Sequence, residues 1–267
     1  MKDKQTPGCT IVVTRPVEQA KKLIESLQDA GISAVHFPVI AISPGNDQQQ
    51  LLAQAEKLAS YDMAIFISRN AADYGSALVK KALGTGNWPQ QTRIAAIGRG
   101  TARQLQQHGL ATDIVTKGPA SSETLLAETE MQQVAGKHII ILRGNGGREK
   151  LAETLRQRGA VVEYLECYKR ERPHVKPDIL SDLWLNNSLD GIVLSSAEGL
   201  QNLYQMVRKE DLPRLNHTPL FVISSTMVEL CGKLGYKLKP ILMPSATDED
   251  VIEAVTAFCR NNKVTDN

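Results

Sequence analysis

The sequence predicts an α/β protein with two similar lobes, each built on an open parallel sheet flanked by helices. Short apolar, β-branched runs alternate with amphipathic helical patterns along all 267 residues. The chain also repeats itself at an offset of 128 positions (139 − 11). Its 42% hydrophobic and 22% charged residues are typical of a globular protein that is long enough for two ordinary domains.

The clearest local pattern lies at residues 139–151. The apolar run 139–142 ends in a glycine-rich loop with Arg143 and Arg148 at its edges, and an amphipathic helix pattern follows as far as Gly159. This order predicts a buried strand, a tight turn and a helix N-terminus. Unpaired N–H groups and the helix dipole favour an anion there, and arginines donate bidentate hydrogen bonds to carboxylates or phosphates.

The same pattern occurs earlier, at residues 11–31. In an ungapped alignment of the two copies, Arg15 matches Arg143 and Gly31 matches Gly159. Three further pairs of segments follow in the same order: 61–68 with 189–196, 92–98 with 218–224, and 119–123 with 244–248. One match could be chance, but four in order indicate a duplicated α/β unit of about four βα steps.

Parallel sheets bind ligands beyond the carboxyl ends of their strands. The residues expected at those ends are Thr14, Arg15, Ser68, Arg69, Gly98, Arg143, Gly144, Ser195, Ser196, Ser224, Ser225 and Thr226. Each hydroxyl taken singly is more readily explained as a helix cap. Together, the hydroxyls and free N–H groups would line a cleft suited to a ligand with several carboxylates. Extended segments near 35–44 and 163–170 suggest linkers, and a deep cleft between the lobes follows as a hypothesis.

Several classes of site are excluded by spacing. The loop at Gly144 fits neither GxGxxG nor the GxxxxGK[ST] phosphate loop, and no serine lies in a GxSxG turn. Isolated histidines argue against a metal site. The four cysteines form no CxxC pair and are expected to be reduced thiols: Cys9, Cys167, Cys231 and Cys259.

Net charge and hydropathy limit the partners that the protein can attract and the places where it can be located. A formal net charge of +2 gives no long-range attraction to nucleic acid or membranes, so any anion site must be local. The first eight residues contain no signal-peptide core, and no run of 18 apolar residues occurs. The sequence predicts a cytoplasmic protein.

Tyr168 lies in the second extended segment, beside Lys169 and Arg170. A strand tyrosine usually packs its ring and leaves its hydroxyl to water. Neighbouring cations could instead lower its pKa and make it a proton donor. The residues alone favour packing.

An ordered set of segments resembles one known family over nearly the whole chain. The segments are Thr14-Arg15-Pro16, Phe-Pro-Val-Ile at 37–40, Phe66-Ile-Ser68-Arg-Asn70-Ala, Ala96-Ile-Gly98-x-x-Thr101-Ala102, Leu142-Arg-Gly144 with Gly147-Arg148-Glu, Cys167-Tyr168-Lys-Arg and Leu194-Ser195-Ser196. The set resembles uroporphyrinogen-III synthase. No single motif is diagnostic, but the order is specific.

This resemblance implies two flavodoxin-like lobes that are interleaved along the chain and face a cleft. One lobe would contain 1–35 and 172–267, the other 43–162, and 36–42 with 163–171 would form a two-stranded linker. The repeat alone suggests contiguous halves instead.

The resemblance also implies a reaction: hydroxymethylbilane, a linear tetrapyrrole with eight carboxylates, is closed with inversion of its last ring and loss of water. No cofactor or metal is implied, and a monomer is expected. Tyr168 matches the family's linker tyrosine and would help the hydroxyl depart. Residues expected to bind substrate are the strand-end set above except Arg69 and Ser224, together with Thr101 and Arg148. The alternative is a non-catalytic, two-lobed binder of a small polycarboxylate.

Overall fold

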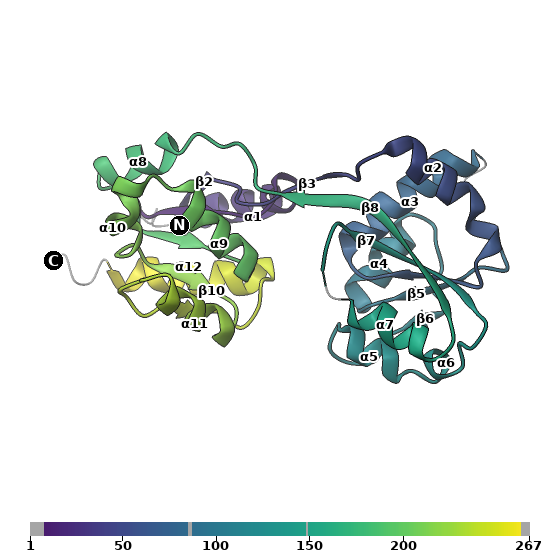
Figure 1. Ribbon diagram of the computed structural model, residues 1–267. Coiled ribbons are helices and arrows are strands. Elements are labelled where there is room, and N and C mark those ends of the chain that lie inside the picture. The colour runs from purple at the N-terminus through teal and green to yellow at the C-terminus, as the bar shows by residue number, and fades with distance from the viewer. Residues whose placement is uncertain (1–7, 85–86, 148, 263–267) are drawn as a thin grey trace, which may run out of the picture. The chain divides into compact units, whose positions relative to one another are not determined.

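The computed structural model describes residues 8–84, 87–147 and 149–262, which form two compact units (Figure 1). The terminal unit contains the described residues up to Ala41 and those from Glu171 onward, and the central unit is Ile42–Arg170. The chain therefore passes between the units twice, at the start of β3 (Ala41–Pro44) and at the end of β8 (Val161–Glu171).

The terminal unit has a five-stranded sheet in the order β11-β10-β9-β1-β2, and its neighbouring strands run parallel. Its strands are β1 (Thr10–Val13), β2 (Ser33–His36), β9 (Gly191–Val193), β10 (Leu220–Val222) and β11 (Ile241–Leu242). The helices α1 (Val17–Asp29) and α12 (Asp248–Asn262) pack on one face. The other face is covered by α8 (Asp178–Leu185), α9 (Ala197–Met206), α10 (Leu212–Leu215) and α11 (Ser225–Lys233).

The central unit has a six-stranded sheet in the order β3-β8-β7-β4-β5-β6. Besides β3 and β8, its strands are β4 (Met63–Phe66), β5 (Arg93–Ala96), β6 (Ile114–Val115) and β7 (His138–Gly144). One face packs against α2 (Gln48–Glu56), α3 (Arg69–Leu83) and α4 (Arg99–Gln107). The other packs against α5 (Ser122–Ala127), α6 (Thr129–Gln132) and α7 (Lys150–Gln157). Short 3₁₀ turns lie at Lys57–Ser60 and, in the terminal unit, at Lys209–Asp211.

The internal repeat maps onto equivalent strands of the two sheets. The repeat aligns β1, β9 and β10 with β7, β4 and β5, and β2 and β11 occupy the places of β8 and β6. Counted from the repeated arginine strand, both sheets follow the flavodoxin-like order 2-1-3-4-5. In the terminal unit the equivalent strands follow the chain in the order first to fifth. In the central unit the chain reaches the third, fourth and fifth strands (β4, β5 and β6) before the first and second (β7 and β8), so this copy is circularly permuted. The predicted duplicated α/β fold with parallel sheets is confirmed.

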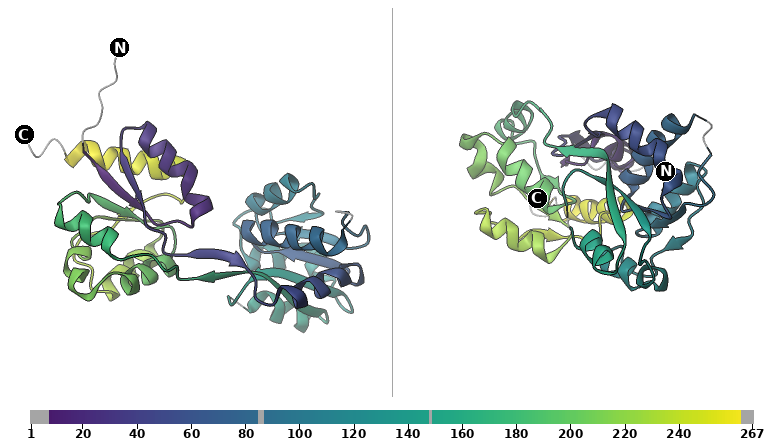
Figure 2. Two further views of the ribbon diagram at one scale, coloured as in Figure 1. Left: turned by 90° about the horizontal axis from the view of Figure 1, so that it is seen from above. Right: turned by 45° about the vertical axis from the view of Figure 1, so that its right-hand side comes forward.

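Residues 163–171, expected as a linker strand, lie within the longer strand β8. This strand pairs with β7 from Val161 to Tyr168, so most of it belongs to the central sheet. Residues 36–42 include the end of β2 and the start of β3. Two further views show that helices flank both faces of each sheet (Figure 2).

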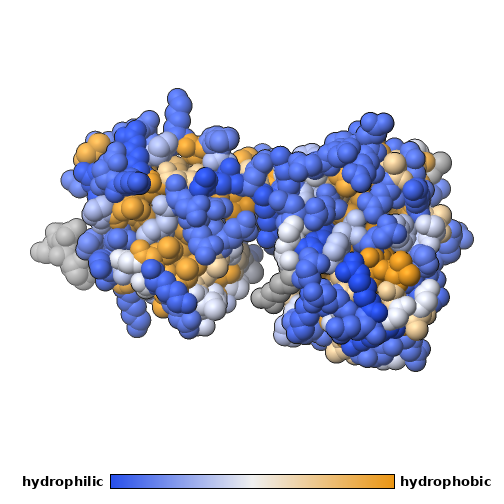
Figure 3. All heavy atoms as spheres, viewed as in Figure 1, coloured by the Kyte–Doolittle hydropathy of each residue, from blue (hydrophilic) through white to orange (hydrophobic). Residues whose placement is uncertain are grey.

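Polar side chains cover most of the visible surface of each unit (Figure 3). This is the expected outcome of amphipathic helices that turn their apolar faces to the sheets. No helix among the described residues combines the length and apolarity needed to cross a bilayer.

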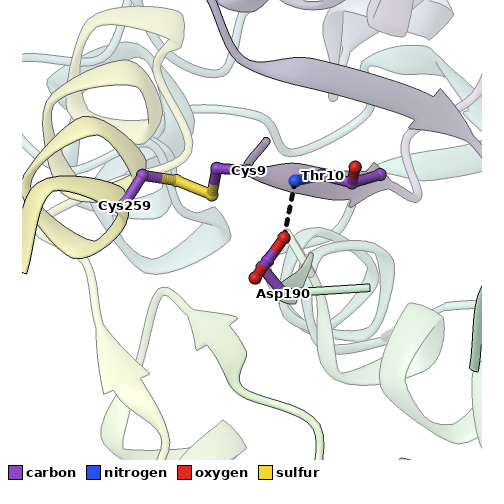
Figure 4. Close-up of a disulfide and its surroundings, with 4 residues drawn as sticks. All are labelled: Cys9, Thr10, Asp190 and Cys259. Atoms are coloured by element: carbon purple, nitrogen blue, oxygen red, sulfur yellow. Dashed lines mark hydrogen bonds between the residues drawn. A yellow bond between two sulfur atoms is a disulfide. The ribbon is translucent and has the colours of Figure 1, made fainter. Parts of the chain in front are cut away.

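A disulfide joins Cys9, just before β1, to Cys259 in the last part of α12 (Figure 4). The two cysteines are 250 positions apart, but α12 packs against the strand that Cys9 precedes, which leaves their Cα atoms 5.9 Å apart. The expectation of reduced thiols is therefore wrong for this pair. Cys167 and Cys231 are free and buried.

We expect reduction of this disulfide, or a Cys9→Ser/Cys259→Ser double substitution, to lower the free energy of unfolding by roughly 2–5 kcal/mol, because the bond closes a very long loop. Urea unfolding with and without dithiothreitol measures the change, and the reductant should not affect the double variant. Four reactive thiols in the denatured, unreduced protein, in place of two, would rule out the disulfide.

Candidate functional site

Serine side chains cap the helices that follow the central strands of both sheets. The Ser68 hydroxyl accepts a hydrogen bond from Ala71 N at 3.1 Å, and the Ser196 hydroxyl accepts one from Gly199 N at 3.0 Å. The two serines are equivalent in the repeat. Ser224 caps α11 in the same way, which leaves Ser225 and Thr226 exposed in the first turn of that helix. The capping interpretation of Ser68 and Ser196 is confirmed, and both remain partly exposed.

The repeated arginines are buried and bonded within the protein. Arg15, which is 7% exposed, lies with its Nη1 2.5 Å from Asp248 Oδ1 and donates from Nη2 to the Ala246 carbonyl at 2.7 Å. Arg143, which is 3% exposed, forms an ion pair with Glu149 at 3.0 Å. Each guanidinium therefore fixes a neighbouring loop at the carboxyl end of its sheet.

Two threonines and one glycine of the expected set also have internal roles. The buried hydroxyls of Thr14 and Thr101 donate to the carbonyls of Val193 and Ile97, at 2.7 and 2.8 Å. Gly98 has φ +85°, and a Cβ there would lie 2.6 Å from the Cβ of Ala120. Glycine is required at this turn because any side chain would be strained and would clash.

A cavity of about 580 Å³ opens at the carboxyl ends of β4 and β5. It brings together Ser68 and Gly98, which the sequence placed at strand ends, and Thr101, which the family resemblance added. Arg69 and Arg99 also line it, and both are exposed. Neither forms an ion pair with any residue that the structure describes.

The sequence places Arg69 at a strand end but singles out neither arginine as a binding residue, although a signal for both is present. Each is the first residue of its helix and directly follows the capping residue, Ser68 before α3 and Gly98 before α4. Together with the helix N-termini, they form a cationic rim that suits carboxylates. The sequence directed attention to the repeated arginines, which are buried.

A smaller cavity of about 270 Å³ adjoins the repeated loop and contains Arg143, Gly147 and Tyr164. The Arg143 guanidinium lies 4.5 Å from the centre of the Tyr164 ring. Hydrogen bonds from the Tyr164 hydroxyl and then from Arg143 hold the pKa of the Glu149 carboxyl below its usual value. Burial raises the pKa of Tyr164, and its hydrogen bond to Glu149 adds to that shift. Arg148 lies outside the described residues.

Tyr168 reaches its position through an irregularity in β8. Leu165 and Cys167 face the helices α2 to α4, and strict alternation would turn Tyr168 to the other face. The register shifts at this point: Arg143 pairs with Glu166, but Gly144 pairs with Tyr168. The extra residue returns the Tyr168 ring to the face that carries α3, as β-bulges near active sites commonly do.

The Tyr168 ring is held by close packing. Its hydroxyl lies 3.1 Å from the Ser68 hydroxyl, and the residue is 2% exposed. A Cβ on Gly144 would lie 2.6 Å from the ring, so only glycine leaves room for it. The sequence-level prediction that this ring packs is confirmed.

Among the described residues, the site offers neither a reactive thiol nor a cluster of metal ligands. Burial raises the pKa of the neighbouring Cys167 thiol to about 12, so it stays protonated and is a poor nucleophile. Among the described residues, no group of three or more His, Cys, Asp and Glu side chains could hold a metal ion.

The fold and the site define a class of proteins with two related flavodoxin-like units whose strand ends present capped helix N-termini and hydroxyls. A family model described as uroporphyrinogen-III synthase HemD matches residues 21–253. The chain is 33% identical to uroporphyrinogen-III synthase of Escherichia coli K12 over 229 residues, which cover 85% of this chain and 92% of that protein. It is 34% identical to the Proteus mirabilis enzyme, over 73% of this chain and 96% of that protein.

The chain belongs to the uroporphyrinogen-III synthase family, whose members are lyases of tetrapyrrole biosynthesis. Solved structures share the fold at low identity. A mutant uroporphyrinogen III synthase from Thermus thermophilus matches with a TM-score of 0.60 at 16% identity, over 96% of this chain and 97% of that one. The Helicobacter pylori 26695 enzyme matches with a TM-score of 0.56 at 14% identity, over 97% of this chain and 100% of that one.

We expect Gly144→Ala to destabilise the protein by roughly 1–3 kcal/mol, because the added methyl group forces the packed Tyr168 ring to move. Urea unfolding measures the change. Gly232→Ala is the matched control, since a Cβ there meets nothing within 4 Å and the position is helical. It should be neutral or stabilising by roughly 0.5–1 kcal/mol. Wild-type stability of Gly144→Ala would contradict the packing argument.

Proposed function

We propose that this chain closes hydroxymethylbilane to uroporphyrinogen III, with inversion of the last ring and release of one water. Membership of the family, by sequence over most of the chain, carries the proposal. The substrate's eight carboxylates need cationic and N–H partners, and the cavity of the central unit presents Arg69, Arg99 and the N-termini of α3 and α4 beside them.

In the terminal unit we assign the corresponding role to the partly exposed Ser195 and Ser196 and the exposed Ser225 and Thr226. Ser196 caps the N-terminus of α9, and Ser225 and Thr226 are the first residues of α11. Their hydroxyls and the neighbouring backbone N–H groups can donate to a carboxylate without a buried charge. The buried Arg15 and Arg143 instead shape the turns that present these groups.

The chemistry we propose has two parts. Binding folds the linear chain so that the last ring attacks through the carbon that inverts it, which is catalysis by positioning. Tyr168 supplies a proton for the departing hydroxyl as a general acid. The reaction needs no external oxidant or reductant, because the only other product is water.

We also propose that the protein acts as a monomer in the cytoplasm. Each unit buries both faces of its own sheet. The exposed large apolar side chains of the described chain lie in separate segments: Val17, Val161, Leu185, Leu238 and Leu242. The net charge of +2 gives nucleic acid no general attraction to this protein.

Incubation with freshly made hydroxymethylbilane tests the function. The wild type should form uroporphyrinogen III faster than isomer I arises spontaneously. Tyr168→Phe should remain folded, because the ring is kept, and should form isomer III about tenfold more slowly, at the low end of general-acid effects. Isomer I alone from the wild type would favour a non-catalytic polycarboxylate binder.

Arg69→Ala and Arg99→Ala should each raise KM about fivefold to fiftyfold with little change in kcat, because each removes a charge-assisted contact to a substrate carboxylate. Arg93→Ala is the matched control. Arg93 starts β5 at the opposite end of the same sheet and lies 3.8 Å from Glu130, so its loss should leave KM unchanged. A wild-type KM in all three variants would exclude a role of the arginine rim in binding the substrate.

A further inference from the structure

The geometry points to a two-hydroxyl relay in which Ser68 carries the proton from the buried Tyr168 to the substrate. This inference deepens the proposed function and rests on it. It assigns Ser68 as the group that contacts the departing hydroxyl, and Tyr168 as the proton source behind it.

Burial separates Tyr168 from the cavity. The tyrosine is 2% exposed and is absent from the residues that line the 580 Å³ cavity, whereas Ser68 lines that cavity and is partly exposed. The two hydroxyl oxygens are 3.1 Å apart. A proton from Tyr168 therefore reaches the cavity in one step through Ser68.

The hydrogen-bond inventory of Ser68 fixes the direction of the relay. A serine hydroxyl has one hydrogen to donate and two lone pairs that accept. One lone pair accepts Ala71 N–H. If Tyr168 donates to the second, the Ser68 hydrogen is free to point into the cavity.

The opposite orientation is less favourable. Ser68 would then donate to Tyr168, and the buried Tyr168 hydrogen would need another acceptor. The described residues provide no second hydrogen-bond partner for that hydroxyl, and a buried donor without an acceptor costs about 1–3 kcal/mol. Tyr168 is thus the donor and Ser68 the acceptor.

The terminal unit has the same serine without the tyrosine. Ser196 caps α9 as Ser68 caps α3. The position equivalent to Tyr168 is residue 40 (168 − 128), which is Ile40. Ile40 lies near Gly199 in the first turn of α9, where its side chain would be 3.8 Å from an added Cβ. The relay therefore belongs to the central unit alone, although the cap is duplicated.

The proposed step is balanced. Ser68 donates its hydrogen to the hydroxyl of hydroxymethylbilane, the carbon–oxygen bond breaks with its electron pair, and water leaves. Ser68 takes the Tyr168 proton at the same time. The proton that the attacking ring loses, after the new carbon–carbon bond forms, returns through Ser68 to Tyr168. One substrate gives one product and one water, with no change in redox state.

A double-mutant cycle with Ser68→Ala, Tyr168→Phe and the combined variant tests the relay. Because both hydroxyls act as a unit, we expect each single variant and the double variant to lose the same factor in kcat, about tenfold, with KM little changed. Ser68→Thr keeps a hydroxyl and should retain most of the wild-type kcat. A solvent deuterium isotope effect on kcat should be present in the wild type and reduced in all three variants.

Asp47→Ala is the control for the lost helix cap. The Asp47 side chain caps α2 by accepting from Gln50 N at 3.0 Å, and Asp47 is exposed and lies outside the relay. This variant should lower the melting temperature, as Ser68→Ala should, but should keep wild-type kcat and the isotope effect. Melting curves show that all variants are folded at the assay temperature.

Multiplicative losses in the double variant, or wild-type kcat in Ser68→Ala, would overturn the relay while the wild type still formed isomer III. Failure of the wild type to form isomer III would instead overturn the proposed function. The two failures are therefore distinguishable in one assay.

Discussion

Parallel strand pairing is the constraint on which both units depend. It places the carboxyl ends of neighbouring strands at one edge of each sheet, and every following helix begins there with unpaired N–H groups. Those groups require partners, and serine side chains supply them for α3, α9 and α11. The same hydroxyls lie where a ligand would bind, so in the proposed function helix capping and substrate recognition use one set of residues.

Ion pairs and a disulfide hold the last helix of each copy. In the terminal unit, α12 is tied by Arg15 to Asp248 at its start and by the Cys9–Cys259 disulfide near its end. In the central unit, Glu123 at the start of α5 forms an ion pair with Lys150 of α7 at 3.0 Å. A buried arginine left without its carboxylate is strongly destabilising, so the Arg15 pair constrains its loop more than an exposed pair does.

Duplication gave the two units the same scaffold and different chemistry. Equivalent serines cap equivalent helices, but only the central unit combines a register shift in its strand, a glycine opposite it and a tyrosine behind the serine. A single extra residue at Cys167 moves Tyr168 from one face of the sheet to the other. Under the proposed relay, the difference between a binding unit and one that also moves a proton is a local change in strand pairing.

The sequence by itself determined the duplicated α/β fold, because apolar periodicity and an ungapped repeat are properties of the chain order. It also placed Ser68 and Gly98 at strand ends. It did not determine that Arg15 and Arg143 are buried while Arg69 and Arg99 are exposed, since loop packing decides which guanidinium is paired. The disulfide and the Ser68–Tyr168 contact join residues 250 and 100 positions apart, and only the packing of helices on the sheets brings such residues together.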